Sequence, residues 1–273
     1  MPLSQSSKTR IRQAAIVERV MAEGSCAAQQ LANDLGVSIM TIHRDLDQLE
    51  RRGLVRRFRG GVRARPPGAF ESQLAFRMAS RSAEKDAIAR VALMHVEPGM
   101  SVLLDDSTSV LPMTRGLAEH APITVATNFM TGLRELTDAA ADIDLTVLAL
   151  GGTYDVAMDS FSGLQTVEQV NDLAVDALFM SVSAIAATQA FDNAEHTVAL
   201  KRAMMASAAK TYVLVDHTKF GRSALRRLAT LTEVELVITD TGIDPLVLRA
   251  WDAAGVNYQI AQLPTDSLSS AHI

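Results

Sequence analysis

The stretch SIMTIHRDLDQLERRGLVRRFRGGV, residues 38–62, places six arginines within twenty-five positions. Residues 1–65 hold 12 Lys and Arg against 6 Asp and Glu, whereas residues 66–273 hold 14 against 25. The formal net charge of -5 therefore hides a basic front and an acidic remainder. This asymmetry indicates a basic module that meets a polyanion, joined to a body with a different task. Composition alone leaves a chance cluster of solvated arginines open as the alternative.

Three helices are predicted in the basic front. Apolar residues recur every three or four positions over residues 11–21, and Gly24 follows as a stop. The run AAQQLANDLG predicts a second helix ending at Gly36, a residue that readily takes the left-handed conformation of a sharp turn. Ser38 is typical of an N-cap. The third helix then carries an apolar stripe at Ile39, Ile42, Leu46 and Leu49. Helix, glycine turn and helix predict a helix-turn-helix.

The face of the third helix opposite this stripe is polar and basic. At about 100° per residue, Arg44 points directly away from the stripe. Side chains of this kind can hydrogen-bond base edges or touch a thymine methyl, as a helix in a major groove requires. His43 lies at the flank, where it suits a phosphate or a peripheral base. The predicted DNA-contacting residues here are Ser38, Met40, Thr41, His43, Arg44, Gln48 and Arg51. The alternative is that these side chains only solvate an exposed helix face and bind nothing.

A short hairpin is predicted directly after the third helix. The run LVRRFRGGV follows Gly53 and has two β-prone arms around Gly60 and Gly61, which is typical of a wing. Three further predicted DNA contacts, Arg56, Arg57 and Arg59, then flank the groove and neutralise phosphates. Each neutralised phosphate contributes about 0.9 to the slope of log affinity against log salt. The arginines of the opening stretch are therefore predicted to form a footprint for double-stranded DNA.

The same residues resemble a known family. The run LANDLGVSIMTIHRDLDQLERRGLVRRFRGGV resembles the winged helix-turn-helix of the DeoR family of transcriptional regulators. The matching positions are Val37, Ser38, Thr41, Ile42, Arg44, Asp45, Leu46, Gly60 and Gly61. His43 stands where the family pattern has the first of two arginines. The resemblance implies an operator-binding protein.

The rest of the chain predicts an α/β fold. Pro66, Pro67 and Gly68 open a linker over residues 66–83, a body covers residues 84–263, and residues 264–273 form a flexible tail. The predicted strands are SVLLD, ITVATN, LTVLAL, ALFMSVS, YVLVD and LVITD, and the predicted helices lie near residues 84–96, 110–119, 129–140, 163–173, 195–209 and 244–254. Near-continuous apolar strands separated by helices indicate a parallel sheet buried on both faces. The predicted architecture is a winged helix-turn-helix domain followed by an open, mostly parallel α/β domain.

Polar residues return where each predicted strand ends. Ligands of open α/β sheets bind in the crevice beyond these carboxyl ends, so a pocket is predicted there. Residues 107–109 are placed to hold a phosphate at the start of the next helix, although Asp106 opposes an anion. The candidate effector-binding residues are Asp105, Ser107, Thr108, Ser109, Thr127, Asn128, Gly151, Gly152, Ser183, Lys201, Asp216 and Lys219. Taken singly, a residue of these types is more often a cap or a surface group than a ligand contact.

The body is similar to the DeoR sensor domain, itself related to ribose-5-phosphate isomerase and glucosamine-6-phosphate deaminase. The similarity rests on Glu84-Lys85, Ile88-Ala89, Asp105 with Thr108, Thr127-Asn128, residues 150–152, 201–204 and 216–220, and Thr239-Asp240. It implies a repressor of a sugar or polyol catabolic operon, commonly relieved by a phosphorylated sugar. Two segments depart from the family pattern: residues 105–109, in place of Asp-x-Gly-Thr-Thr, and the run SVSAI, in place of a Gly-rich turn.

Three functions compete. The first is a transcriptional regulator, which needs no catalysis, whose affinity for operator DNA changes when a sugar-like effector binds. The second is a sugar-phosphate isomerase or deaminase with a DNA-binding appendage; it needs a positioned base, yet no carboxylate follows the fourth strand until Asp192. The third is a constitutive DNA binder whose pocket is inactive.

Composition narrows the classes of protein to which the chain can belong. The single cysteine, Cys26, excludes an internal disulfide, and the six histidines show no metal-ligand spacing, so no metal site is expected. No cofactor is expected either. No eighteen apolar residues run together, and the first residues lack the apolar region of a leader, so a soluble cytoplasmic protein without membrane contact is expected. Because twofold operators pair with twofold proteins, we expect a homo-oligomer, a dimer or tetramer, assembled mainly through the body.

Overall fold

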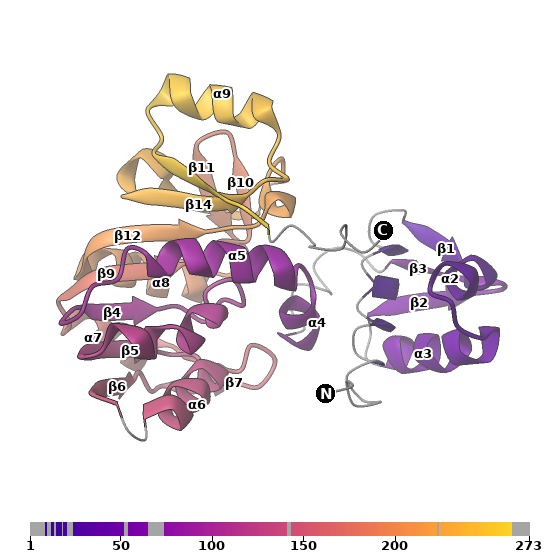
Figure 1. Ribbon diagram of the computed structural model, residues 1–273, viewed down its shortest axis with the longest axis horizontal. Coiled ribbons are helices and arrows are strands. Elements are labelled where there is room, and N and C mark those ends of the chain that lie inside the picture. Colours follow the sequence, from indigo (N-terminus) through magenta and orange to yellow (C-terminus); the bar gives the residue numbers. More distant parts are fainter. Residues whose placement is uncertain are drawn as a thin grey trace, which may run out of the picture. The chain divides into compact units, whose positions relative to one another are not determined.

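The computed structural model describes residues 9, 12–13, 15–17, 19–20, 24–51, 54–64, 74–140, 143–222 and 224–263. The chain divides into two compact units, Met1–Ser82 and Ala83–Ile273 (Figure 1). The predicted tail, residues 264–273, and the first part of the predicted linker, residues 66–73, lie outside the described residues. Within the described ranges, no helix combines the length and the hydropathy that crossing a bilayer requires.

The first unit is a helix-turn-helix with a three-stranded wing. The described residues between positions 9 and 20 are helical, as the spacing predicts. The elements that follow are β1 (Ser25–Ala27), α2 (Ala28–Asp34), α3 (Ile39–Arg51), β2 (Val55–Phe58) and β3 (Gly61–Ala64). The strands form an antiparallel sheet in the order β1-β3-β2. The predicted hairpin is confirmed, and β1 is an addition that the sequence analysis did not include.

The wing turn differs in detail from the expectation. It lies at Arg59 and Gly60, whereas Gly61 already belongs to β3 and pairs with Phe58. A Cβ atom at position 61 would lie 2.5 Å from the carbonyl oxygen of Cys26 and 2.8 Å from the Phe58 ring. Glycine at position 61 therefore serves the close approach of β1 to β3 rather than the turn itself.

The apolar stripe of α3 packs into the core of this unit. Ile42, Leu46 and Leu49 are buried, and Ser38 caps the helix because its Oγ accepts a hydrogen bond from Thr41 N at 3.1 Å. The rest of the core comes from the first helix, α2 and the wing, through Ile16, Val17, Val20, Leu31, Leu54, Val55 and Val62. The packing thus fixes which face of α3 remains outside.

The second unit is built on a seven-stranded parallel sheet. Its strands are β4 (Ser101–Leu104), β5 (Ile123–Thr127), β6 (Leu145–Ala149), β9 (Val175–Met180), β12 (Ala208–Leu214), β14 (Leu236–Asp240) and β15 (Tyr258–Ala261). They lie in the order β15-β14-β12-β9-β4-β5-β6, and every pair is parallel. The six predicted strands and the α/β fold class are confirmed. The edge strand β15, which is short and half-buried, was not predicted.

The helices between these strands mostly follow the predicted pattern. The α-helices are α5 (Ser82–Leu93), α6 (Met130–Ala139), α7 (Leu164–Asn171), α8 (Glu195–Ser207) and α9 (Pro245–Ala254), with short 3-10 helices η2 (Leu111–Arg115), η3 (Leu117–His120), η5 (His217–Lys219) and η6 (Leu231–Glu233). One expectation, a single helix near residues 110–119, was wrong. The helix predicted near residues 110–119 is instead the pair of short 3-10 helices η2 and η3, with Gly116 between them against Leu93. The predicted linker contains α4 (Leu74–Ala79) and the start of α5.

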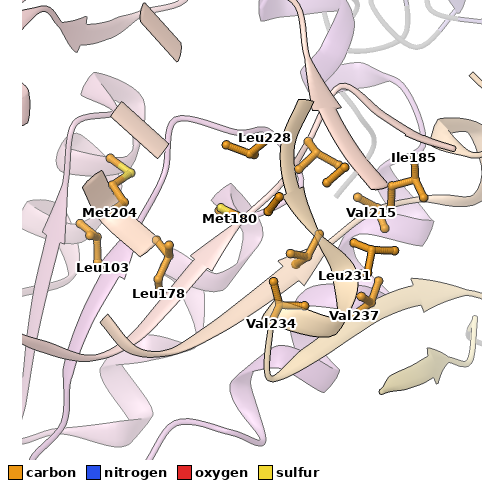
Figure 2. Close-up of a cluster of buried hydrophobic side chains, with 14 of the residues drawn as sticks. Leu103, Leu178, Met180, Ile185, Met204, Val215, Leu228, Leu231, Val234 and Val237 are labelled. Atoms are coloured by element: carbon orange, nitrogen blue, oxygen red, sulfur yellow. The ribbon is translucent and has the colours of Figure 1, made fainter. Parts of the chain in front are cut away.

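Helices cover both faces of the sheet, which buries alternate strand residues on opposite sides (Figure 1). Val102 and Leu104 pack with α5, whereas Leu103 packs on the other face with α7 and α8. Figure 2 shows part of the cluster on the face covered by α7 and α8, where Leu103, Leu178, Met180 and Met204 lie together. Because neither face is open, a ligand can reach the sheet only at its ends.

Two small antiparallel elements lie beyond the strand ends and were not predicted. The hairpin of β7 (Thr153–Asp155) and β8 (Ser160–Ser162) follows β6. A three-stranded sheet joins β10 (Ala184–Ala186), β11 (Gln189–Asp192) and β13 (Arg226–Thr230). Both bring additional polar side chains to the edge where the candidate effector residues gather.

Candidate functional site

The outer face of α3 carries unpaired side chains around Arg44. Arg44 and Arg51 are exposed, and 60% of the surface of Met40 is accessible. Within the part of the chain that the structure describes, Arg44 has no hydrogen bond or ion pair. Helix packing therefore leaves its guanidinium, which carries a paired set of donors, available for a partner outside this unit.

One flank of α3 is fastened to the first helix. Asp45 is only 2% exposed, and its carboxylate accepts hydrogen bonds from Arg12 Nε at 2.5 Å and Gln13 Nε2 at 3.1 Å. Gln13 Nε2 also donates to Gln48 Oε1 at 2.6 Å. Gln48, which the sequence predicts as a DNA contact, is exposed but already shares its side-chain carbonyl with the first helix.

The other flank of α3 is fastened to the wing through Arg57. The Arg57 guanidinium forms an ion pair with Asp47, and its Nη2 lies 2.9 Å from His43 Nδ1. The backbone N–H of Arg57 donates to Glu50 Oε1 at 2.8 Å. Arg56 and Arg59, in contrast, are exposed. Of the three predicted phosphate contacts, two are thus presented to solvent and one is engaged by α3.

At the carboxyl edge of the sheet, a buried lysine organises several predicted effector residues. Lys201 Nζ lies 2.9 Å from Asp192 Oδ2 and 3.3 Å from Asp105 Oδ2, and it donates to the Ser181 carbonyl at 2.7 Å. Ser183 Oγ donates to the other oxygen of Asp192 at 2.5 Å. The structure therefore brings Asp105, Ser183 and Lys201 into one network, which Asp192 joins between Lys201 and Ser183.

The charged groups of this network shift one another's pKa values. Burial raises the pKa of Asp105, and the Lys201 charge only partly offsets this. Burial acts in the same direction on Asp192, but the Lys201 charge and the Ser183 hydrogen bond hold the pKa of Asp192 below its ordinary value. Burial would lower the pKa of Lys201, yet the Asp192 and Asp105 carboxylates outweigh it and raise that pKa. The neighbouring carboxylates therefore favour the charged form of Lys201 and balance its charge within the network.

Contrary to the prediction, no α-helix begins at the loop of residues 107–109. Ser107 N donates to Asp105 Oδ1 at 3.0 Å, and the N–H groups of Val110 and Leu111 both donate to the Ser107 carbonyl. The helix that follows is the 3-10 helix η2, so the predicted cradle of free N–H groups is only partly present. Instead, the buried Lys85 ammonium donates to Thr108 Oγ1 at 3.1 Å, while Ser107 Oγ has no hydrogen-bond partner among the described residues.

The remaining candidate effector residues are spread along the sheet edge. Asn128 Nδ2 donates to the Phe161 carbonyl at 2.8 Å, and Thr127 Oγ1 accepts from Phe129 N, so both hold the backbone beyond β5. Gly151 bonds through its carbonyl to Thr166 of α7. Asp216, Lys219 and Gly152 lie in the turns after β12 and β6. The hydrogen bonds of Thr218 lower the pKa of Asp216 against the effect of burial, with help from the Lys219 and Lys85 charges.

Comparison with known proteins identifies the family of both domains. Residues 80–241 match the profile of the DeoR C terminal sensor domain, and residues 12–66 match that of the DeoR-like helix-turn-helix domain. The chain belongs to the DeoR family. It is 29% identical over 243 residues to the transcriptional repressor AccR of Agrobacterium fabrum, covering 88% of this chain and 93% of the relative. It is 27% identical over 228 residues to the glycerol-3-phosphate regulon repressor of Escherichia coli, covering 82% and 88%. A solved ribose 5-phosphate isomerase from Methanocaldococcus jannaschii aligns over 52% of this chain and 55% of that one, with 16% identity and a TM-score of 0.37.

This DeoR-family regulator has a small cavity at the same edge of its sensor domain. The cavity measures about 20 Å³, which is room for about one water molecule. Its lining comes from the 105–106 turn, the β7–β8 hairpin and α8: Asp106, Asp155, Met158, Ser160, Ser162, His196, Thr197, Leu200, Lys201 and Met204. Asp106 Oδ2 accepts a hydrogen bond from Ser160 Oγ at 2.6 Å, which ties the hairpin to the edge. Of the predicted effector residues, only Lys201 lines this cavity.

Four residues of the DeoR sensor edge were not among the predicted site residues: Lys85, Asp106, Ser160 and Asp192. Lys85 carried a signal, since it belongs to the Glu-Lys pair on which the family resemblance rests. Asp192 and Ser160 were not assigned to the site because they reach the edge only through β11 and β8, which sequence periodicity did not reveal. Among the described residues, no group of histidine, cysteine and acidic side chains is arranged to hold a metal ion.

Proposed function

We propose that this DeoR-family regulator represses a sugar or polyol catabolic operon by binding operator DNA through α3 and the wing. The observation that carries the proposal is the unpaired, exposed guanidinium of Arg44 on a helix whose two flanks are fastened inside the unit. Such a fixed helix can enter a major groove without further ordering. The proposed contacts are Ser38, Met40, Thr41, His43, Arg44, Gln48, Arg51, Arg56 and Arg59.

The proposed effector is a phosphorylated sugar or polyol at the carboxyl edge of the sheet. Its hydroxyls suit the free oxygen of Asp106 and the Ser160 hydroxyl, which line the cavity. A phosphate suits the Lys85 ammonium, which already donates to Thr108 Oγ1, and the Ser107 hydroxyl, which has no hydrogen-bond partner among the described residues. The proposed effector residues are Asp105, Ser107, Thr108, Ser109, Thr127, Asn128, Gly151, Gly152, Ser183, Lys201, Asp216 and Lys219, with Lys85, Asp106 and Ser160 added.

The proposal requires coupling between the two units. A change in DNA affinity of about five- to 150-fold on effector binding, about 1 to 3 kcal/mol, is typical of such regulators. A homo-oligomer of even number, assembled through the sensor domain, supplies the symmetry that a twofold operator needs. Because the cavity holds about one water, the effector must displace side chains such as Ser160, and that movement is what the DNA-binding unit would respond to.

Catalysis is not part of the proposal. A carboxylate does lie beside the turn after β9, but Asp192 is hydrogen-bonded by Ser183 and paired with Lys201, and its lowered pKa makes it a weak base. Incubation with ribose 5-phosphate and with glucosamine 6-phosphate tests this directly. We expect no turnover above background with either compound, and measurable turnover would restore the enzyme hypothesis.

One paired experiment tests the proposed function. Gel-shift titrations of the chain's own upstream region measure operator binding, and a thermal-shift screen of sugar phosphates, polyols and free sugars identifies the effector. We expect specific binding to that DNA, and a compound that raises the melting temperature and changes the DNA affinity. Specific binding without any stabilising compound would favour the constitutive DNA binder instead. Absence of specific binding would contradict the function as a whole.

A further inference from the structure

The contact between Arg57 and His43 determines where the imidazole proton lies. Arg57 Nη2 and His43 Nδ1 are 2.9 Å apart. A guanidinium has only donors, so it cannot accept a hydrogen bond from the ring. His43 Nδ1 must therefore be the acceptor, which requires a neutral ring with its proton on Nε2. A doubly protonated ring would direct a second N–H at the guanidinium and lose the contact.

Arg57 is held in place for this contact by two acidic side chains of α3. Its guanidinium forms an ion pair with Asp47, and its backbone N–H donates to Glu50 Oε1 at 2.8 Å. These partners lie one and two turns after His43 on the helix face that meets the wing. The guanidinium is therefore oriented by α3 before any DNA arrives, in contrast to the exposed Arg56 and Arg59.

The second ring nitrogen of His43 is left for an outside partner. His43 is half-buried, and the part of the chain that the structure describes supplies no hydrogen bond to its Nε2. Its sequence neighbour is Arg44, at the centre of the exposed face. The protonated Nε2 is thus a single, neutral donor at the rim of the surface proposed to read DNA.

We propose that Arg57 is a positioning residue that fixes His43 as an Nε2–H donor, and that His43 selects a hydrogen-bond acceptor on a base edge. The proposal rests on the DNA-binding function above. In the major groove a donor pairs with guanine O6 or N7, adenine N7 or thymine O4, whereas the amino group of cytosine offers only donors. Cytosine opposite His43 is therefore disfavoured, and Arg57 contributes no phosphate contact.

The tautomer can be measured without DNA. The full chain, labelled with nitrogen-15 in its histidine rings, gives separate signals for protonated and unprotonated ring nitrogens at neutral pH. We expect His43, assigned by its absence in His43→Gln, to show an unprotonated Nδ1 and a protonated Nε2. In Arg57→Met the two tautomers should mix. A His43 ring with its proton on Nδ1 in the wild type would overturn the proposal.

The role of Arg57 is tested on a duplex that the wild-type protein selects from a randomised library. Arg56→Met and Arg59→Met are the matched controls, and each should reduce the slope of log affinity against log salt by about 0.9 while leaving base preference unchanged. Arg57→Met should keep the wild-type slope and lose preference at one base position. A slope reduced by about one unit with unchanged preference would instead make Arg57 a phosphate contact and refute the inference.

A second variant guards against damage to the wing. His43→Gln keeps an acceptor and a donor on one side chain and leaves Arg57 in place, so we expect it to retain the preference at that position, whereas His43→Phe should lose it. Equal preference in His43→Phe and wild type would overturn the base contact. If the wild-type protein selects no sequence at all, the DNA-binding function itself fails, which is distinguishable from failure of the His43 assignment alone.

Discussion

Lys201 Nζ lies 2.9 Å from Asp192 Oδ2 in the interior of the sensor domain. The lysine comes from α8 and the aspartate from β11, so the ion pair joins this helix to the small antiparallel sheet. Both side chains are only 8% exposed. The pair therefore fixes the geometry of the proposed effector site, and it also explains why Lys201 is a poor anchor for a phosphate.

Loss of this lysine should strongly destabilise the sensor domain. Lys201→Met leaves two buried carboxylates without compensation, and we expect a loss of about 3 to 5 kcal/mol in the free energy of unfolding. Trp251 is the only tryptophan and is buried in this unit, so its fluorescence during urea titration reports the change. The control is Lys210→Met, which removes an exposed ion pair with Glu235 and should cost under about 1 kcal/mol. Equal effects of the two variants would contradict the buried pair.

Low pH should lower the stability of the sensor domain because Asp192 becomes protonated. Its pKa is lower in the folded chain than its ordinary value, so the unfolded chain binds the proton more readily and stability falls with pH. The contribution is complete at pH values above the ordinary pKa and is lost as pH falls below it and through the lower pKa of the folded chain. Urea titrations at several pH values should give a shallower acid loss for Asp192→Asn than for wild type. An unchanged pH slope would show that Asp192 is not held ionised by Lys201.

The carboxylate of Asp45 should be required to hold α3 in place. Asp45→Ala leaves Arg12 and Gln13 without their buried acceptor, and we expect a loss of about 1 to 3 kcal/mol in the first unit. Amide hydrogen exchange of α3 measures this loss locally. Asp34→Ala, which removes only the exposed partner of Arg19, is the control and should leave exchange in α3 nearly unchanged. Equal protection of α3 in both variants would contradict the role given to Asp45.

The sequence predicted those parts of the fold that depend on long periodic patterns. The stripe of Ile42, Leu46 and Leu49 determines α3, and the continuous apolar strands determine the parallel sheet. Short elements were missed because their stability comes from partners distant in sequence. Strand β1 has only three residues and forms because Gly61 allows β3 to approach Cys26. Local composition contains no sign of such a pairing.

The candidate sites were predictable to different depths. Helical geometry placed Arg44 outward from the sequence alone, because one angle per residue decides it. The pairing of Arg57 with Asp47 and His43 depends on how the wing folds back on α3, which spacing does not reveal. In the same way Asp192 reaches Lys201 only through the β10–β11 turn, so its place beside the predicted effector residues appears only in three dimensions.

The most direct test of DNA recognition by the exposed face of α3 is the affinity of the Arg44→Ala variant for the selected duplex and for its single-base variants. Fluorescence anisotropy at fixed salt measures both, with Arg134→Ala in the sensor domain as the control for loss of an exposed arginine. We expect Arg44→Ala to lose about 1 to 3 kcal/mol of binding free energy and to relax the preference at one base position. Wild-type affinity and selectivity in that variant would contradict DNA recognition by this face.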